Sequence, residues 1–539
     1  MAMVTSKRNS QIIVIGAGIG GLTAAALLAR NGYAVTVFEQ AQIPGGCAST
    51  FRRRGFTFDV GATQVAGLEP GGIHDRIFQT LDLEPPASTP CDPACAVYLP
   101  GEQEPISVWR DRLQWQEEQR RQFPGSEAFW NLLHTLFEAS WRFQGRDPVL
   151  PPRNLWDGLQ LLGALRPDTL VTVPFTFSTV VDALNLCGLG SGSGSDRALT
   201  HRRLRTFLDL QLKLYSQVDA SETALLYAAT ALSVSQEPQG LCHLEGSMQV
   251  LSDRLVQALH QWGGALYCGQ RVEAILSPDG ERVSGVRVWD TKTHLSRTVP
   301  ADHVIANVTV QNLVELVQTH GAPHTAPHGK LPPRMQGYAR RVKGLPPASG
   351  AFVLYLGVKR SAIPASCPPH LQFLYSYDPL AAGLSITGNP QETIAENNSL
   401  FVSVSREGDG RAPDGQATIV ASSFTELTPW WKADPSQYRS LKALYTTTAL
   451  ERLGQFFDLS PGQVLHQEAA TPCTFARYTH RHQGAVGGLS QRISSFAPFG
   501  FANRTPLGGL WLVGDCTHPG EGTAGVSYSA WTVVRQICA

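Results

Sequence analysis

The chain has 539 residues, which is enough for three or four domains of roughly 150 residues or for a large two-domain enzyme. Hydrophobic residues make up 42% of the chain and charged residues only 16%, which excludes an intrinsically disordered protein. The 44 Lys and Arg residues balance the 44 Asp and Glu residues. A nucleic-acid-binding protein would carry a basic excess, so we expect no nucleic-acid partner.

The ten cysteines are scattered along the chain and contain no Cys-x-x-Cys pair. Cys91 and Cys95 flank Pro93, a spacing that matches no zinc or iron–sulfur motif. We therefore expect free thiols in a reducing compartment and no bound metal.

Residues 9–29 form an apolar stretch without a charge over 21 residues. A cluster of glycines at residues 16–21 would break a membrane-spanning helix in two, and no small-residue cleavage site follows. We expect neither a signal peptide nor a membrane span, and therefore a cytoplasmic protein.

The first elements along the chain are predicted to be a strand at 11–15, a helix at 22–31 and a second strand at 34–38 that ends in Glu39. The first strand is followed by Gly16-Ala17-Gly18-Ile19-Gly20-Gly21, which matches the pattern G-x-G-x-x-G. This order of strand, glycine-rich turn, helix, strand and acid is typical of a dinucleotide-binding unit.

The residue types in this unit each have a physical reason. Gly16 permits a tight turn, Gly18 lets the backbone approach a pyrophosphate, and Gly21 lets the helix pack close to the strand. The helix N-terminus attracts phosphates, and Glu39 can accept hydrogen bonds from ribose hydroxyls. We predict that Gly20 also belongs to the site, and an acid at position 39 disfavours NADP.

The segment after Glu39 favours FAD over NAD. It contains a second pair of glycines, Gly45-Gly46, and then a run that ends in Asp59-Val60-Gly61. This arrangement resembles the flavin-containing amine oxidase and phytoene desaturase superfamily. There the corresponding residues contact the pyrophosphate and approach the flavin ring, which implies cofactor roles for Gly45, Gly46, Asp59 and Gly61.

One residue in this segment departs from the superfamily pattern. Cys47 occupies the position at which the relatives usually have an arginine after the two glycines. The arginine contact is therefore lost at this position. The run at 52–54 is an alternative source of that contact, or it is simply solvated.

A second part of the resemblance lies near the C-terminus. A predicted strand at 509–513 leads to Gly514 and Asp515, and in the superfamily this acid holds the ribityl chain. A turn then begins the last helix, and the resemblance implies that its N-terminus, with Gly525 and Val526, faces the pyrimidine edge of the flavin. A helix N-terminus would stabilise the negative charge of a reduced flavin.

The middle of the chain completes the implied cofactor domain. A helix at 251–262 and strands at 269–275, 283–289 and 301–307 follow the superfamily order, in which the backbone of Val272 contacts adenine. The resemblance implies an α/β, Rossmann-type FAD-binding domain that is discontinuous. We expect it to comprise residues 1–90, 240–310 and 470–539.

Residues 91–239 and 311–470 are expected to form a substrate and membrane-contact domain with a mixed sheet and helices, as in amine oxidases and phytoene desaturases. Its helical patterns at 125–190 are rich in Trp, Leu and Phe, which fits either an ordinary core or a lipophilic tunnel and membrane-contacting surface. We predict a flexible loop at 188–195 and a strand at 350–358 beneath the pocket. The turn at 411–415 resembles one in carotenoid desaturases.

The sequence offers only weak candidates for catalytic residues. No hydrolytic triad, P-loop or metal cluster is present. His518 lies in the C-terminal turn, where it is either next to the flavin or an ordinary turn residue. His480 and His482 follow a segment typical of the superfamily and lie either in the site or in a solvated loop.

Across its length the chain resembles the FAD-dependent carotenoid desaturase/isomerase family. The tail Thr517-His518-Pro519-Gly520 is most similar to the cyanobacterial C-3′,4′ carotenoid desaturases, although Ala524 replaces a usual proline. This implies C-3′,4′ desaturation of an acyclic carotenoid end group on the route to myxoxanthophyll, with hydride transfer to the flavin and a quinone or oxygen as the electron acceptor.

The same resemblance implies a substrate that resides in lipid, so we expect peripheral attachment to a membrane surface. Three alternatives stay open. The first is a carotenoid cis–trans isomerase of the prolycopene type that uses reduced FAD. The second is another flavin oxidase of the amine oxidase superfamily. The third is a flavin-free lipid escort, which would not need the glycines and acids described above.

Overall fold

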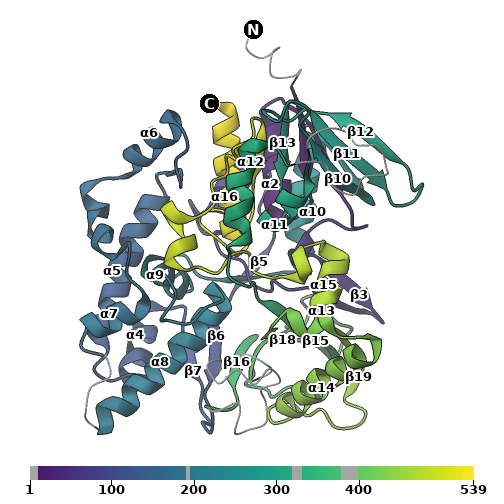
Figure 1. Ribbon diagram of the computed structural model, residues 1–539. Helices are drawn as coiled ribbons and strands as arrows, with labels where there is room; N and C mark the ends of the chain where they lie inside the picture. The colour runs from purple at the N-terminus through teal and green to yellow at the C-terminus, as the bar shows by residue number, and fades with distance from the viewer. Residues whose placement is uncertain (1–9, 190–194, 319–330, 378–397) are drawn as a thin grey trace.

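The computed structural model describes residues 10–189, 195–318, 331–377 and 398–539, without the side chains of residues 195–200 and 318. Figure 1 shows a parallel sheet near both termini, a second large sheet at the opposite end, and a layer of helices along one side. The predicted loop at 188–195 falls mostly on residues 190–194, which lie outside the described residues.

The sheet near the termini has five parallel strands in the order β20-β13-β1-β2-β9. Runs such as Ile12-Ile13-Val14 are buried on both faces, as expected for a parallel sheet covered by helices. The first two strands confirm the sequence prediction. The strands are β1 (Gln11–Ile15), β2 (Ala34–Glu39), β9 (Ala265–Cys268), β13 (His303–Ala306) and β20 (Leu510–Leu512).

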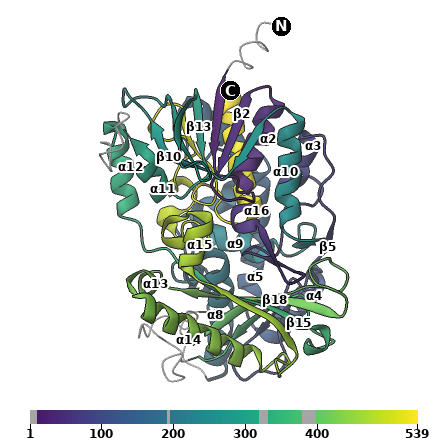
Figure 2. The same cartoon turned by 90° about the vertical axis from the view of Figure 1, so that its right-hand side faces the viewer.

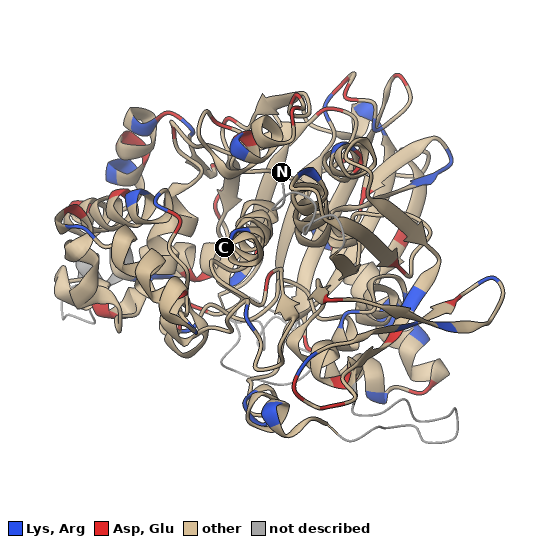
Figure 3. Ribbon diagram, turned by 90° about the horizontal axis from the view of Figure 1, so that it is seen from above, with Lys and Arg blue, Asp and Glu red and all other residues tan. Residues whose placement is uncertain are grey.

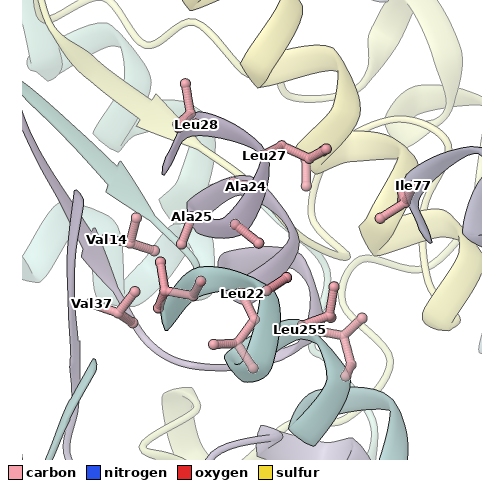
Figure 4. Close-up of a cluster of buried hydrophobic side chains, with 14 of the residues drawn as sticks. Val14, Leu22, Ala24, Ala25, Leu27, Leu28, Val37, Ile77 and Leu255 are labelled. Carbon is pink, nitrogen blue, oxygen red and sulfur yellow. The ribbon is translucent and has the colours of Figure 1, made fainter. Parts of the chain in front are cut away.

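Helix α2 (Ile19–Arg30) packs between α10 (Gln249–Gln261) and α16 (Thr523–Cys538), and α3 (Ile73–Thr80) adjoins them. It begins three residues earlier than predicted, because Gly18 is already its N-cap. Its alanines are fully buried and let the neighbouring helices approach closely. Figure 4 shows Leu22, Leu27 and Leu28 of this helix among buried side chains of β1, β2, α3 and α10.

A smaller sheet of four strands, in the order β12-β11-β10-β14, lies beside the parallel sheet. The strand predicted at 283–289 begins two residues later, because Val283 donates its backbone N–H to the carbonyl of Gly508 instead. The strands are β10 (Gln270–Leu276), β11 (Gly285–Asp290), β12 (Ser296–Pro300) and β14 (Val317–Gln318).

The sheet at the opposite end has seven strands in the order β19-β15-β18-β17-β16-β6-β7. It is mixed, because β16 and β6 are parallel while the other pairs are antiparallel. The strand predicted at 350–358 is confirmed as β15. The strands are β6 (Cys95–Tyr98), β7 (Ile106–Val108), β15 (Gly350–Lys359), β16 (His370–Leu374), β17 (Ser399–Val404), β18 (Gln416–Thr425) and β19 (Val464–Ala470).

The helical layer contains the aromatic-rich segment of the sequence. Residues 167–175 form a 3-10 helix, and its internal Pro174 does not suit an α-helix interior. The elements of the layer are α4 (Arg112–Gln122), α5 (Glu127–Gln144), α6 (Leu155–Ala164), η2 (Pro167–Phe175), α7 (Val180–Leu186), α8 (Ser195–Ser216) and α9 (Leu225–Ser233).

The remaining elements connect these layers. In both views α15 lies between the parallel sheet and the seven-stranded sheet (Figures 1 and 2). The helices are α11 (Val310–Leu316), α12 (Pro333–Lys343), α13 (Thr428–Lys432), α14 (Pro435–Leu453), α15 (Pro472–Thr479), η1 (Gly46–Ala48), η3 (Arg360–Ala362), η4 (His482–Gly484), η5 (Ile493–Ser495) and η6 (Ala497–Phe499). The two hairpin pairs are β3 (Thr50–Arg53) with β4 (Phe56–Asp59) and β5 (Ser88–Pro90) with β8 (Cys242–Leu244).

All ten cysteines lie within the described residues, and each is a free thiol. No helix in the described ranges combines the length and apolar character needed to cross a bilayer. In the same ranges, no cluster of His, Cys, Asp and Glu side chains has the arrangement of a metal site.

Candidate functional site

A single large cavity of about 1940 Å³ connects the parallel sheet to the seven-stranded sheet. Its lining runs from Gly16 and Glu39 through Asp515 to Trp141 and Phe424. A pocket for one small ligand measures roughly 300–1,000 Å³. The cavity is therefore large enough for two ligands, one against the glycine-rich turn and one against the apolar far end.

The glycine-rich turn is fixed by close contacts with Asn307, which directly follows β13. A Cβ atom on Gly18 would lie 2.6 Å from the Asn307 side-chain amide, and one on Gly16 would lie 2.9 Å from its carbonyl oxygen. With its amide oxygen turned toward the loop, Asn307 accepts from the N–H groups of Gly18 and Gly21, each at 3.3 Å. Asn307 was not predicted from its sequence context. It follows β13 at the same edge of the parallel sheet at which β2 ends in Glu39.

Glu39 ties the glycine-rich turn to the end of β2. Its carboxylate accepts from the N–H of Ala17 at 2.7 Å and from the N–H of Ala41 at 2.8 Å. Burial raises the pKa of Glu39, and these two N–H groups oppose the rise because they stabilise the ionised form. The side chain lines the cavity, so its position agrees with the predicted contact to a ribose.

The second pair of glycines docks onto the first turn. Gly45 has a left-handed backbone (φ 116°) that favours glycine, and its N–H donates to the carbonyl of Ala17 at 2.7 Å. Gly45 also pairs with Gly18 in an isolated β-bridge. The structure thus brings together two glycine motifs that lie 27 positions apart in the sequence.

The predicted cofactor residues that line the cavity are Gly16, Gly18, Gly20, Glu39, Gly45, Gly46, Gly61, Val272, Asp515, Gly525 and Val526. Gly21, Gly514 and Asp59 are absent from the lining. Gly21 and Gly514 pack instead against Asn307, where a Cβ atom on Gly514 would lie 3.0 Å from the side-chain oxygen. These two glycines therefore leave room for Asn307, which in turn contacts the glycine-rich turn.

Asp59 lies outside the cavity lining, and other protein groups bind its carboxylate. The side chain is buried and accepts from Arg411 Nε at 3.1 Å, from Arg411 Nη2 at 3.0 Å and from the N–H of Met248 at 2.9 Å. Arg411, which is equally buried, also donates to His243 Nε2 at 2.8 Å. Asp59 thus forms a buried ion pair between β4 and the turn before β18, and its approach to a flavin ring stays a prediction.

The three candidate histidines are placed differently. His518 lines the cavity, its Nε2 lies 3.0 Å from Gln144 Oε1, and burial lowers its pKa to about 4, so it is neutral at pH 7. His480 lines the cavity at the end of α15. His482 is not in the lining, and its Nδ1 lies 3.3 Å from Glu315 Oε1.

Two charged residues line the site that the sequence did not identify as site residues, Arg481 and Glu521. Arg481, next to His480, has its guanidinium 2.8 Å from the carboxylate of Asp515. Glu521 precedes α16, accepts from Gln217 Nε2 at 3.3 Å, and has a pKa raised well above its usual value by burial. The only signal for Glu521 was an acid within the glycine-rich turn before the last helix.

The far end of the cavity is apolar and lies between helices and the seven-stranded sheet. The aromatic-rich segment was expected to form either an ordinary core or a lipophilic tunnel, and it contributes to both a core and a cavity. Phe129 and Leu133 of α5 are core residues, whereas Trp141 of the same helix lines the cavity. Further lining side chains from this end are Phe143, Leu210, Leu214, Leu226, Phe401, Phe424 and Phe496. This chamber suits a long apolar ligand.

Comparison with known proteins agrees with this geometry. Residues 14–81 match the family model of an NAD(P)-binding Rossmann-like domain, which covers the glycine-rich turn and Glu39. The structure is similar to cyclohexylamine oxidase from Brevibacterium oxydans, with a TM-score of 0.56 and 16% identity over 98% of this chain and 100% of the oxidase. This likeness supports the fold, and the Rossmann match supports a nucleotide cofactor.

Two sequence relatives match over almost the whole chain. Prolycopene isomerase 2 of an Oncidium hybrid cultivar, a chloroplastic protein, is 25% identical over 99% of this chain and 85% of its own length. The zeta-carotene-forming phytoene desaturase of Myxococcus xanthus is 26% identical over 99% of this chain and 95% of its own length. Over nearly its whole length the chain is therefore similar to carotenoid isomerases and desaturases.

Proposed function

We propose that the protein is an FAD-dependent oxidoreductase that desaturates a carotenoid, with C-3′,4′ desaturation of an acyclic end group as its specific reaction. The observation that carries this proposal is the single cavity that joins the glycine-rich turn and Asp515 to an apolar chamber. Relatives that are named for reactions on carotenoids match over nearly the full chain, which supports the substrate class.

The residues of the nucleotide end fit FAD. The N-terminus of α2 and the two glycine motifs leave room for a diphosphate, Glu39 lies where a ribose is expected, and Asp515 and the N-terminus of α16 extend the lining beyond the reach of an adenosine group. FAD, when bound, supplies a two-electron acceptor. Its electrons would pass on to a quinone or oxygen.

The chain's own residues contribute binding, orientation and the exclusion of water. Apolar side chains such as Trp141 and Phe424 would bind a hydrocarbon by burial, which stabilises the complex by about 25 cal/mol per Å² of apolar surface. A positive charge that develops on a polyene is delocalised, so a strong base is not required. This agrees with the environment of His518, which lines the same cavity: burial lowers its pKa to about 4, so its imidazole is a weak base.

Isomerisation of a carotenoid is the second candidate, and the full-length similarity to prolycopene isomerases favours it. The two reactions differ in mass balance. Desaturation removes two hydrogens, consumes one two-electron acceptor per double bond and lengthens the chromophore. Isomerisation leaves the mass unchanged and consumes no acceptor.

The deciding experiment is an anaerobic incubation of the purified protein with an acyclic-ended carotenoid, FAD and a quinone, followed by mass spectrometry. We expect a product that is lighter by two hydrogens and absorbs further to the red, and a parallel incubation with oxygen compares the two acceptors. Asp515→Ala, assayed at an FAD concentration that limits binding, is the control with reduced FAD occupancy and should form less product. A product of unchanged mass with altered retention, formed only under reducing conditions, would establish the isomerase instead.

We further propose that the protein attaches peripherally to the lipid surface in which its substrate resides. Helix α6 exposes apolar side chains and buries a charged one, which is the reverse of a helix on a surface that faces only water. Its Leu155 and Leu162 are 80% and 66% exposed, whereas its Asp157 is fully buried. Leu155, Leu159 and Leu162 follow helical spacing and form one apolar stripe.

The stripe continues into η2 and reaches the cavity. Leu170, Val173 and Phe177 are more than half exposed, and Phe177 packs on Phe499 with ring centroids 5.6 Å apart. Val173 also belongs to the cavity lining, as does Leu165 at the end of α6. An apolar ligand could therefore pass between the lipid and the cavity beside this surface, which we call the α6–η2 surface.

Liposome flotation tests this attachment. Seen from above, Lys and Arg are interspersed with Asp and Glu rather than gathered on one face (Figure 3), so binding should persist at high salt. The variant Leu155→Asp/Leu162→Asp should lose the floating fraction. Leu444→Asp, which changes a half-exposed leucine on the distant helix α14, should float like the wild type. Equal flotation of all three proteins would contradict the proposal.

A further inference from the structure

Arg481 is a buried cation at the nucleotide end of the cavity. It lies in the short connection between α15 and η4, and its side chain is only 17% exposed. Its Nε donates to the carbonyl of Ala485 at 2.6 Å, and its guanidinium faces the carboxylate of Asp515 at 2.8 Å. A guanidinium has five N–H donors, so these two partners leave donors for a ligand in the cavity.

The surrounding backbone holds Arg481 against the loop that carries Asp515. Gly484 and Gly488, which follow Arg481, both have left-handed φ angles near +75°. A Cβ atom on Gly488 would collide with the backbone of Asp515, and one on Gly484 would collide with the carbonyl of Pro472. Only a glycine-rich segment can pack this closely, so the contact between Arg481 and Asp515 is built into the fold.

Cys47 is a near neighbour of this ion pair. Cys47, Arg481 and Asp515 all line the nucleotide end of the cavity. Burial raises the pKa of the Cys47 thiol, Arg481 opposes this rise electrostatically, and Asp515 adds to it. Cys47 directly follows Gly45-Gly46, and Gly46 in turn lies against Gly18 of the glycine-rich turn. The position at which the sequence lacks an arginine is thus the position beside which the fold places Arg481.

The arginines at 52–54 do not supply this charge. All three side chains are exposed on the hairpin of β3 and β4. Arg53, the one that reaches the cavity lining, is half-exposed and pairs with Glu468 at 3.4 Å. The expectation that this run replaces the missing contact is therefore not supported by their positions.

Charge balance gives the reason for a buried arginine here. A diphosphate group brought beside the carboxylate of Asp515 would be repelled unless a cation lay between them. The N-terminus of α2 supplies only about half an elementary charge. Arg481 supplies a full charge in a planar arrangement of donors that suits both a carboxylate and a phosphate.

We propose that Arg481 binds the diphosphate of the dinucleotide and supplies from α15 the cationic contact that is absent at Cys47. This inference rests on the proposed binding of FAD. A diphosphate contact from Arg481 makes the connection after α15 part of the cofactor site, although this connection lies more than 430 positions from the glycine-rich motifs.

The test is a fluorescence titration of FAD into the purified apoprotein. Arg481→Met should weaken FAD binding by roughly 10- to 100-fold, which is the usual effect of losing hydrogen bonds to a charged group. Arg52→Met, the matched control, should change the affinity by less than about 2-fold, because Arg52 is exposed and does not line the cavity. The second-site variant Cys47→Arg should restore part of the affinity lost in Arg481→Met, which a purely structural role of Arg481 would not allow.

Competition with ligand fragments separates a diphosphate contact from a flavin contact. ADP should lose affinity in Arg481→Met by a similar factor, whereas riboflavin should not. Arg481→Lys keeps the charge and should fold even where the methionine variant does not, with a smaller loss of FAD affinity. Wild-type affinity in both Arg481 variants, or a loss confined to riboflavin, would overturn the inference, whereas a wild-type protein that binds no FAD would overturn the proposed function instead.

Discussion

At the scale of single residues, the ion pair of Asp59 and Arg411 shows how a charged motif can serve the fold rather than the ligand. Both side chains are at most 4% exposed, and they join β4 to the turn before β18. Removal of one partner leaves the other as an uncompensated buried charge, which costs about 3–5 kcal/mol. The Asp-x-Gly pattern of the sequence could not reveal that the carboxylate pairs with Arg411, which lies 352 positions away.

We therefore predict that Arg411→Leu lowers the free energy of unfolding by about 3–5 kcal/mol. Urea denaturation monitored by tryptophan fluorescence measures this change. Arg53→Met, which removes an exposed ion pair, should lower it by less than about 1 kcal/mol. Equal effects of the two substitutions would show that the buried pair has no special role.

A buried histidine gives a prediction about pH. His74 is 2% exposed, its Nδ1 lies 2.8 Å from the carbonyl oxygen of Ala66, and burial lowers its pKa from 6.5 to about 4. Between these values the unfolded chain binds a proton that the folded protein does not, so stability falls as the pH drops from 6.5 to 4 and this contribution is constant below 4. The loss for this one group is about 3 kcal/mol.

His74→Gln should make the melting temperature less sensitive to pH in that window. The measurement is a series of thermal melts between pH 7 and pH 4.5. His294→Gln is the control, because His294 is exposed. If the control and His74→Gln shift the pH dependence alike, the buried imidazole is not responsible.

At the scale of elements, α6 shows a polar anchor beneath an apolar outer face. Its buried Asp157 accepts from Arg504 Nε at 3.1 Å and from Gln536 Nε2 at 3.0 Å, which attaches the helix to the C-terminal part of the chain. Asp157→Ala should loosen α6 without loss of FAD binding. We expect faster proteolysis and amide exchange within 153–168, while Glu138→Ala on the exposed side of α5 leaves both rates unchanged. Unaltered exchange in α6 would contradict this anchor.

A comparison of α2 with α6 shows which features of a helix can be predicted from the sequence. The strand, glycine-rich turn and helix up to Arg30 were predictable, because the tight turn requires glycines and the buried helix requires small apolar residues, and both are visible in the local sequence. The pattern of α6 shows leucines at helical spacing but not which side of the helix faces outward. That side is decided by Asp157, whose side-chain partners Arg504 and Gln536 lie more than 340 positions away.

At the scale of the whole molecule, the same limit applies to the candidate site. The glycine-rich turn, Glu39 and Asp515 were predictable from motifs, because each lies at or shortly after the end of a strand that the local sequence reveals. Asn307, Arg481 and Glu521 were not, since their roles arise only when the chain brings distant segments against the same cavity. The described cavity joins residues from nearly every part of the chain, so occupation of its nucleotide end should couple those segments.

This coupling predicts that FAD stabilises the entire chain. A ligand that binds only the folded protein adds about 2.7 kcal/mol at a concentration 100 times its dissociation constant, so the melting temperature should rise with FAD concentration. Asp515→Ala should weaken FAD binding by about 1–3 kcal/mol and reduce the rise at a given concentration. Differential scanning fluorimetry across an FAD series measures both proteins. A wild-type melting temperature that does not change with FAD would show that the two glycine motifs, Glu39 and Asp515 do not form an FAD site, because a ligand that binds the folded protein must stabilise it.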